Sequence, residues 1–201
     1  VIMKILAIGS HPDDIEIFMF GLLSACLSRG DEIFLVIATD GSAGGKINGN
    51  KLKKTRENET INGLRHLGKP NFLNFKDGDL HNELRASSEI RAFIEKNKPD
   101  LIVTHAPEDY HQDHRTLSKY VKNAARFDCP VIFCDTLLGV NFLPEYYVDI
   151  TNYFDLKKEA IMAHKSQNPK RFCDAIEIQN RFRAAQCNSP KGHYAEAYRF
   201  E

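Results

Sequence analysis

Residues 4–14 read KILAIGSHPDD, a short apolar run that ends in one imidazole and two carboxylates. The run Lys4–Gly9 has the length and the continuous apolar character of a strand buried on both faces of a parallel sheet. The residues that follow, Asp14–Arg29, carry apolar side chains at helical spacing, and Gly30 is placed to be their C-cap. This stretch therefore predicts the first strand–helix unit of an α/β fold.

The same alternation continues to the end of the chain. Further strands are predicted at Glu32–Thr39, Phe72–Phe75, Leu101–His105 and Val131–Cys134, with weaker patterns at Val148–Ile150 and Glu196–Phe200. Further helices are predicted at Lys53–Leu67, Glu83–Asn97, Gln112–Phe127, Asp155–Lys165 and Lys170–Gln186. We therefore expect one domain over residues 1–201, with a Rossmann-like, mostly parallel sheet and helices on both faces.

A second cluster of imidazoles and carboxylates follows the fourth predicted strand. Residues 111–114 read HQDH, shortly after the strand Leu101–His105. In a doubly wound sheet of order 3-2-1-4-5, strands 1 and 4 are neighbours, and their carboxyl ends border the ligand crevice. The first cluster, His11–Asp14, should then share one site with the second, and zinc binds such nitrogen and oxygen donors.

Each cluster alone has an ordinary explanation. Asp13 and Asp14 could cap the helix that follows, because carboxylates accept hydrogen bonds from free N–H groups at a helix start. An isolated His-x-x-His pair is often explained by structural histidines. The occurrence of both clusters at neighbouring strand ends favours a metal-dependent enzyme over these alternatives.

Composition and the remaining motifs argue against several other classes. Lys plus Arg equals Asp plus Glu at 27 each, so no bulk charge attracts nucleic acid or an anionic membrane. The glycine-rich loop Asp40–Gly45 fails the P-loop pattern because Asp40 stands where glycine is required. Five cysteines without a Cys-x-x-Cys pair indicate free thiols. With no signal-peptide or membrane-span pattern, we expect a cytoplasmic protein.

Several short motifs, taken in order, resemble the PIG-L / LmbE-like N-acetylglucosaminyl deacetylases. They are HPDD (11–14), TDG (39–41), TRENE (55–59), DG (77–78), HQDH (111–114), AHKSQ (163–167) and GHYAEAY (192–198). The resemblance runs through most of the chain. It implies a zinc-dependent enzyme with a Rossmann-like fold that removes acyl groups, usually acetyl, from amino sugars.

Carried over by motif, the resemblance implies that His11, Asp14 and His114 are the zinc ligands and that Asp13 is the general base. Zinc would polarise the amide carbonyl and lower the pKa of a bound water, from which Asp13 would take a proton. Fe²⁺ or another divalent ion also suits two imidazoles and one carboxylate.

The resemblance implies roles for five further residues. His111 would stabilise the oxyanion, and Asp113 would orient His111 and keep it as an imidazolium. Arg56, Asp77 and His193 lie where members of this family contact the substrate.

The partner implied is a small-molecule glycoconjugate, without nucleic acid or membrane insertion, and the resemblance is compatible with a homo-oligomer. The loop Asp135–Tyr147 matches no motif of the family, so we expect it to carry the specificity of this member. His164 is expected to be a structural histidine. Two alternatives stay open: a hydrolase of another acyl group or an ester, and a non-catalytic metal-binding protein on the same fold.

Overall fold

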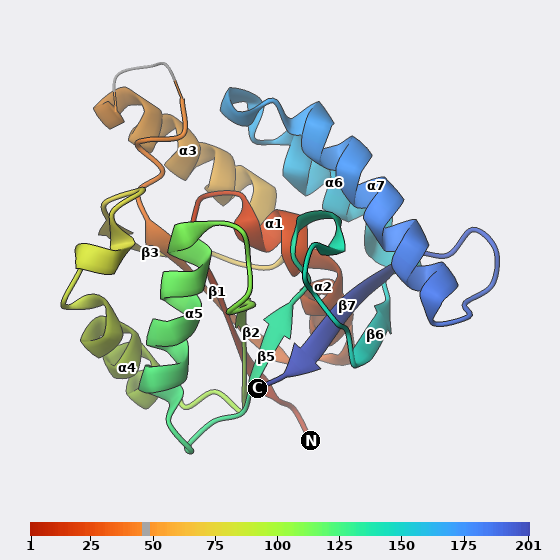
Figure 1. The fold of residues 1–201 in the computed structure, drawn as a ribbon, viewed down its shortest axis with the longest axis horizontal. Helices are drawn as coiled ribbons and strands as arrows, with labels where there is room; N and C mark the ends of the chain where they lie inside the picture. Colours follow the sequence, from red (N-terminus) through yellow and green to blue (C-terminus); the bar gives the residue numbers. More distant parts are fainter. Residues whose placement is uncertain (46–48) are drawn as a thin grey trace.

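A seven-stranded sheet forms the centre of the computed structural model, which describes residues 1–45 and 49–201 (Figure 1). Its strands are β1 (Lys4–Gly9), β2 (Glu32–Thr39), β3 (Asn71–Phe75), β4 (Leu101–His105), β5 (Val131–Cys134), β6 (Tyr146–Asp149) and β7 (Ala195–Phe200). Their order is β3-β2-β1-β4-β5-β7-β6, and β1 to β5 pair in parallel. The predicted order 3-2-1-4-5 is confirmed. The two weaker strand patterns are also confirmed, as β6 and β7, and β7 runs antiparallel to both β5 and β6.

Helices cover both faces of the sheet, as predicted. They are α1 (Asp14–Phe18), α2 (Phe20–Arg29), α3 (Gly49–Gly63), α4 (Ala86–Asn97), α5 (Gln112–Ala125), α6 (Phe154–Met162) and α7 (Pro169–Gln186). Alternate side chains of β1 enter two different cores. Ile5 and Ala7 belong to the core of α1, α2, α6 and α7, whereas Leu6 and Ile8 belong to that of α4 and α5.

The prediction of one continuous helix over Asp14–Arg29 is wrong, because the helix is interrupted at Met19. The buried carboxylate of Glu196, on β7, accepts hydrogen bonds from the backbone N–H groups of Gly21 at 2.9 Å and Leu22 at 2.7 Å. These donors belong to the first turn of α2, which has no intrahelical partners for them. A side chain far away in the sequence therefore stabilises a second helix start.

The other boundaries differ from prediction by smaller amounts. The helix predicted at Lys53–Leu67 begins earlier and ends earlier, at Gly49–Gly63, and is followed by a 3₁₀ turn at Leu64–His66. Gly68, two residues beyond this turn, has a φ of 134°, a conformation that does not continue a helix. The predicted loop Asp135–Tyr147 contains a 3₁₀ turn and the first residues of β6.

The arrangement of β1 and β4 positions the predicted site. The two strands lie side by side, with Ile5 opposite Leu101 and Ala7 opposite Val103. Their carboxyl ends therefore lead to one region, where the turn before α1 meets the start of α5. In the described part of the chain, no helix combines the length and the apolar character needed to cross a bilayer.

Candidate metal centre

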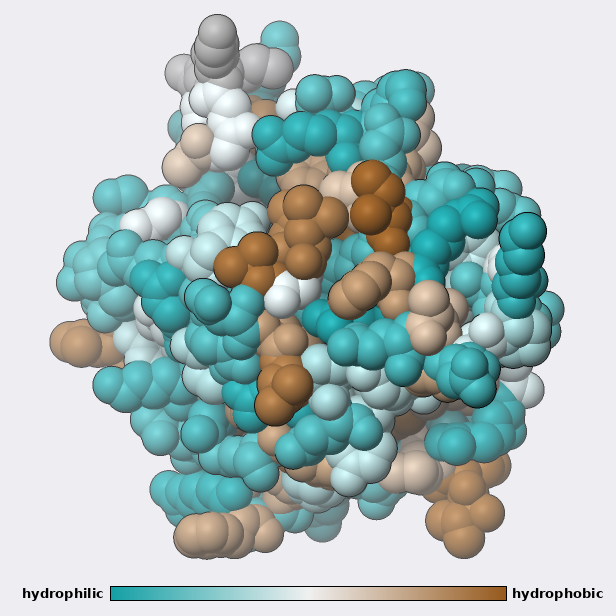
Figure 2. Space-filling view, turned by 45° about the vertical axis from the view of Figure 1, so that its right-hand side comes forward, coloured by the Kyte–Doolittle hydropathy of each residue, from teal (hydrophilic) through white to brown (hydrophobic). Residues whose placement is uncertain are grey.

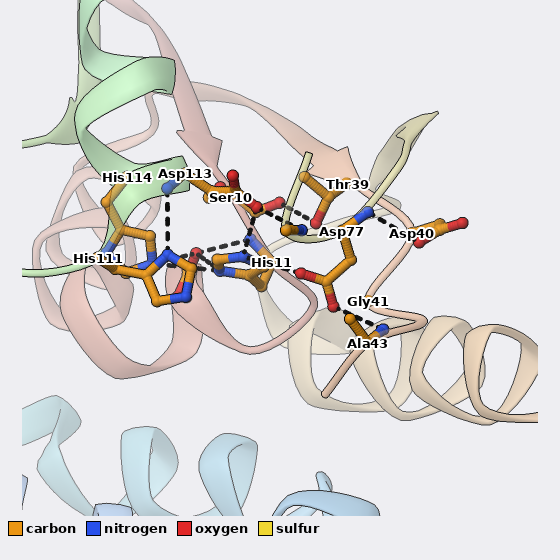
Figure 3. Close-up of polar contacts among 12 residues, drawn as sticks. Ser10, His11, Thr39, Asp40, Gly41, Ala43, Asp77, His111, Asp113 and His114 are labelled. Atoms are coloured by element: carbon orange, nitrogen blue, oxygen red, sulfur yellow. Dashed lines mark hydrogen bonds and ion pairs between the residues drawn. The ribbon is translucent and has the colours of Figure 1, made fainter. Parts of the chain in front are cut away.

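Three donor atoms from the two clusters converge at the carboxyl ends of β1 and β4. His11 Nδ1 lies 3.2 Å from His114 Nε2, and Asp14 Oδ2 lies 3.3 Å from each of these nitrogens. All three side chains are buried, and Figure 3 shows the two rings approaching each other. Ligands held about 2.0–2.1 Å from a tetrahedral zinc ion lie about 3.3 Å apart. The predicted ligand set therefore has the spacing that this metal requires.

The turn between β1 and α1 creates this geometry. Asp13 has a φ of 129°, a conformation that few residues other than glycine adopt. It precedes the first residue of α1, but its side chain makes no capping hydrogen bond. The carboxylate of Asp14 accepts the backbone N–H of His11 at 2.6 Å. Helix capping by Asp13, the ordinary explanation of this motif, is therefore not what the structure contains, and backbone strain of this kind is typical of functional sites.

The ring nitrogens that face away from these donor atoms have carboxylate partners. His11 Nε2 lies 3.3 Å from both Asp77 Oδ1 and Asp113 Oδ2, and His114 Nδ1 lies 3.1 Å from Asp109 Oδ2. Carboxylates placed in this way fix the tautomer and orientation of histidines that bind metals. Sequence reasoning missed Asp109, although it stands two residues before the HQDH motif.

The role predicted for Asp113 needs correction. Its carboxylate contacts His11 and accepts the N–H of Gly78 at 2.8 Å, so it does not orient the ring of His111. Instead, the backbone N–H of Asp113 donates to His111 Nδ1 at 3.2 Å (Figure 3). His111 Nδ1 is thus an acceptor at the N-cap of α5. Burial and the nearby charge of His11 lower the pKa of His111, which favours a neutral ring with its hydrogen on Nε2 rather than the expected imidazolium.

Arg56 is buried at 3% exposure, so it is not a solvated helix charge. Its guanidinium donates to the carbonyl of Pro12 at 2.6 Å, to that of Gly41 at 3.2 Å and to Asp13 Oδ2 at 3.1 Å. Burial raises the pKa of Asp13 to about 6, although the charge of Arg56 acts in the opposite direction. Arg56 therefore holds both the strained turn and the carboxylate at its centre.

The electrostatics of the cluster favour a bound cation. Although burial lowers the pKa of His114, the carboxylates of Asp14 and Asp109 raise it to about 9. Burial acts against the ionised form of Asp14 as well, yet the three neighbouring imidazoles hold the pKa of that carboxyl well below its usual range. The protein thus presents an ionised carboxylate among nitrogens that attract positive charge.

His105 is a second site residue that sequence reasoning missed. It ends β4, is completely buried, and places Nε2 3.0 Å from Asp14 Oδ2. Its only sequence signal was its place as the last residue of a predicted strand. By contrast, His164 was expected to be structural, and it forms a buried pair with Glu16 at 2.7 Å.

A cavity of about 290 Å³ opens beside these donor atoms. Its lining residues are His11, Asp13, Asp14, Ile17, Phe18, Ala43, Gly44, Arg56, Asp77, Gly78, Tyr110, His111, His114, Gln167 and Phe172. A second cavity, of about 330 Å³, lies between α3 and α6, but none of the clustered histidines or aspartates lines it. The volume beside the donor atoms is that of a small-molecule site.

Two predicted specificity elements lie outside this cavity. His193 pairs with Asp149 at 3.0 Å, at the end of β6, and does not line the cavity, in contrast to Arg56 and Asp77. No residue of the loop Asp135–Tyr147 lines it either. That loop packs against α7, where Leu138 N donates to Gln179 Oε1 at 2.7 Å. Figure 2 shows apolar side chains gathered beside a hollow on the side of the molecule where α7 lies.

Comparisons with known proteins place this chain beside known deacetylases. The chain is 28% identical to a diacetylchitobiose deacetylase of Thermococcus kodakarensis, over 99% of this chain and 83% of that protein. The solved N,N'-diacetylchitobiose deacetylase of Pyrococcus horikoshii superposes with a TM-score of 0.83 at 25% identity, covering 99% of this chain and 84% of that one.

The fold is also shared with a different kind of enzyme. The 4-carboxy-2-hydroxymuconate hydratase of Pseudomonas putida superposes with a TM-score of 0.82 at 16% identity, covering 99% of this chain and 96% of that one. This likeness concerns the fold alone, so the fold does not determine the reaction.

The family model described as "PIG-L: GlcNAc-PI de-N-acetylase" matches residues 6–125, more than half of the sequence. The chain therefore belongs to the PIG-L family.

Proposed function

We propose that this protein hydrolyses the N-acetyl group of an N-acetylglucosamine-type sugar or of its conjugate, giving acetate and a free amine. One observation carries the proposal: the donor atoms of His11, Asp14 and His114 lie 3.2–3.3 Å apart, beside a cavity that Asp13 also lines. Membership of the PIG-L family and the likeness to two diacetylchitobiose deacetylases support it.

The proposed cofactor is zinc, held by His11, Asp14 and His114. Two nitrogens and one oxygen are a donor set typical of catalytic zinc, which keeps a further position for a reactant. Bound there, zinc would polarise the amide carbonyl and lower the pKa of water to about 7. Fe²⁺ accepts the same donors, so the identity of the metal is itself a point to test.

Asp13 is the proposed general base. An amide needs a deprotonated nucleophile, and the leaving amine needs a proton before it can depart. The carboxylate of Asp13 would take the proton from the attacking water and then return it to the amine nitrogen. Arg56 donates to one oxygen of this carboxylate at 3.1 Å, which would hold Asp13 at the wall of the cavity.

His111 is the proposed donor to the oxyanion. Because its Nδ1 accepts the backbone N–H of Asp113, its remaining hydrogen is on Nε2. A neutral imidazole can donate this hydrogen to the carbonyl oxygen as negative charge develops there. Asp113 would act through His11, whose Nε2 it contacts, and would keep His11 Nδ1 directed toward the metal.

The polar atoms of Arg56 and Asp77 are largely engaged within the protein. Asp77 accepts the backbone N–H of Ala43 at 3.0 Å and contacts His11 at 3.3 Å. We therefore propose that these two residues shape the cavity wall that contacts the sugar.

The five cysteines are all free, which supports a reducing, cytoplasmic setting.

The test is a panel of N-acetylglucosamine derivatives incubated with the zinc-loaded protein, with released primary amine as the readout. The panel contains the free sugar and its nucleotide-, inositol-, malate- and lipid-linked forms, and Asp13→Asn is the control. Amine release from one member, lost in the control, would support the proposal and identify the aglycone. No release from any member by a zinc-loaded protein would argue for another acyl group, an ester or a non-catalytic role.

A further inference from the structure

His105 contacts the metal centre without belonging to the three converging donors. Its Nε2 lies 3.0 Å from Asp14 Oδ2 and 3.1 Å from the backbone N of Ser10. Asp14 Oδ2 is the oxygen that lies 3.3 Å from both His11 Nδ1 and His114 Nε2. Ser10 is the residue directly before His11. One nitrogen of His105 therefore touches a ligand atom and the backbone that leads to a second ligand.

The ring of His105 also contacts the third ligand. It stacks on the ring of His114, with the centroids 3.7 Å apart and the planes 10° from parallel. Phe18 packs edge-on against both rings, with centroid distances of 5.8 Å to His105 and 6.1 Å to His114. One face of His114 is thus covered by a completely buried ring, which limits how far the imidazole can tilt.

His105 does not have a free lone pair on Nε2 to bind the metal itself. If the hydrogen is on Nε2, that nitrogen donates to Asp14. If it is on Nδ1, the lone pair of Nε2 accepts the N–H of Ser10. A fourth protein ligand would also close the position that a catalytic zinc keeps for its reactant. In one tautomer His105 holds the ligand oxygen of Asp14, and in the other it holds the backbone directly before His11.

We propose that His105 is a positioning residue of the metal centre, which presets the oxygen of Asp14 and the plane of His114 before the ion binds. This inference rests on the proposed function, because it requires that the site binds a metal. Groups that hold metal ligands contribute to affinity because a preset site needs less rearrangement when the ion enters.

Zinc affinity of purified protein, measured by competition with a chromophoric chelator, tests the inference. His105→Phe keeps an aromatic face but removes both nitrogens. His105→Gln places an amide nitrogen near the position of Nε2, whereas the amide of His105→Asn is one carbon too short to reach it. We expect the Phe and Asn variants to bind zinc about 10–100-fold more weakly, and the Gln variant to stay within about threefold of the unaltered protein.

The Co²⁺ absorption spectrum gives a second readout that does not depend on turnover. The bands should shift in the Phe and Asn variants, because the ligand geometry relaxes, and should stay close to the original in the Gln variant. If the Phe variant fails to fold, the Asn–Gln comparison still carries the test, since these two amides differ only in reach. The matched control is Val103→Ala, a substitution at a fully buried position two residues earlier in β4, which should leave zinc affinity unchanged.

Two outcomes overturn the inference. If the Phe and Asn variants bind zinc as tightly as the unaltered protein, with the same Co²⁺ spectrum, His105 only fills space. If the unaltered protein binds none of zinc, Co²⁺ and Fe²⁺, the metal-dependent function fails, and the inference fails with it. The first outcome leaves the proposed function intact, so the two failures are distinguishable.

Discussion

Asp13 combines a strained backbone, a buried carboxylate and a place next to Asp14, a proposed metal ligand. Its φ of 129° is maintained by the surrounding contacts, among them those of Arg56 to Pro12 and to Asp13 itself. Such a conformation has a cost of order 1–3 kcal/mol, which a purely structural turn could avoid with glycine. The strain is therefore best explained by a requirement for a carboxylate at this position.

We predict that Asp13→Asn keeps its zinc and loses turnover by a factor of about 10²–10⁴, the usual contribution of a general acid–base group. Asparagine tolerates positive φ better than most residues, so the turn should survive the change. Zinc content by atomic emission and kcat on the best substrate are the measurements. Loss of zinc from this variant would instead assign Asp13 as a ligand.

We predict that Arg56→Ala destabilises the fold as well as lowering activity. The change leaves the carboxylate of Asp13 and the carbonyls of Pro12 and Gly41 without their donor. Removing one partner of a buried ion pair typically costs about 3–5 kcal/mol. Urea denaturation measures the loss, and Lys54→Ala, an exposed position of the same helix, should change stability by less than about 0.5 kcal/mol. Equal stability of the Arg56 variant and the unaltered protein would contradict this role.

At the scale of residues, the three proposed metal ligands could be brought together from the sequence, whereas the side chains that hold them could not. His11 and Asp14 share one motif, and His114 stands at the corresponding place after the fourth strand. Asp109 and His105 hold these ligands across distances that only the fold defines. A single aspartate or histidine in a loop or at a strand end gives no pattern to read.

The bounds of helices and strands divide in the same way: some depend on the local sequence and others on residues far away in the chain. The bounds of β1, β2, β4 and β5 agree with prediction because buried parallel strands give continuous apolar runs. The interruption between α1 and α2 depends on Glu196, which comes from the far end of the chain. The same carboxylate forms an ion pair with Lys157 Nζ at 2.6 Å and accepts a hydrogen bond from the hydroxyl of Tyr198 at 2.7 Å. No periodicity within Asp14–Arg29 could indicate this break.

We predict that Gly21→Ala destabilises the protein by about 1–3 kcal/mol, although alanine favours helices, because overpacking outweighs propensity. A Cβ at this position would overlap the side chain of Ile150 and lie 2.9 Å from Glu196 Oε1. Gly49→Ala is the control, since its nearest neighbours would lie at an ordinary 3.5 Å. Urea denaturation of both variants is the measurement. A Gly21 variant as stable as the Gly49 variant would show that α2 can shift to make room.

At the scale of the whole molecule, a buried ion pair and two hydrogen bonds attach the segment between α6 and α7 to the helices around the site. Glu16, on α1, pairs with His164 after α6, and Glu59, on α3, accepts hydrogen bonds from Ser166 N and Oγ. The same segment continues to Gln167, which lines the cavity. The cavity wall thus depends on contacts between the two ends of the sequence, which is why its outline could not be predicted from motifs.

We predict that the contribution of His164 to stability falls as the pH rises. Burial lowers the pKa of His164, but the charge of Glu16 outweighs it, so the folded pKa lies above the ordinary value near 6.5. The stabilisation is then fully present below about pH 6.5 and is lost as the pH rises through the folded pKa. The difference in unfolding free energy between the protein and His164→Gln should therefore shrink from about pH 6 to about pH 9. Exposed His81→Gln serves as the control, and a constant difference for His164 would contradict the prediction.

We predict that zinc stabilises the whole fold, because its ligands join the turn after β1 to the start of α5. Free zinc at 100 times its Kd should add about 2.7 kcal/mol to the unfolding free energy, and a chelator should remove this gain. His114→Ala should lose the zinc-dependent gain. His111→Ala should keep it, while its turnover falls by a factor of about 10²–10³, as for the loss of one oxyanion donor.

Thermal melts with and without zinc separate the roles of His111 and His114. The test is needed because His11, His111 and His114 also lie close enough to form an alternative ligand set. If both variants lose the zinc-dependent gain equally, His111 is a ligand and the oxyanion needs another donor. If only His114→Ala loses it, the metal is held as proposed, and the hydrogen of His111 Nε2 is free for the substrate. The second result is expected for two reasons. His111 Nδ1 accepts a hydrogen bond from the backbone N–H of Asp113. Among the described residues, no carboxylate fixes the ring of His111, whereas carboxylates do contact the rings of His11 and His114.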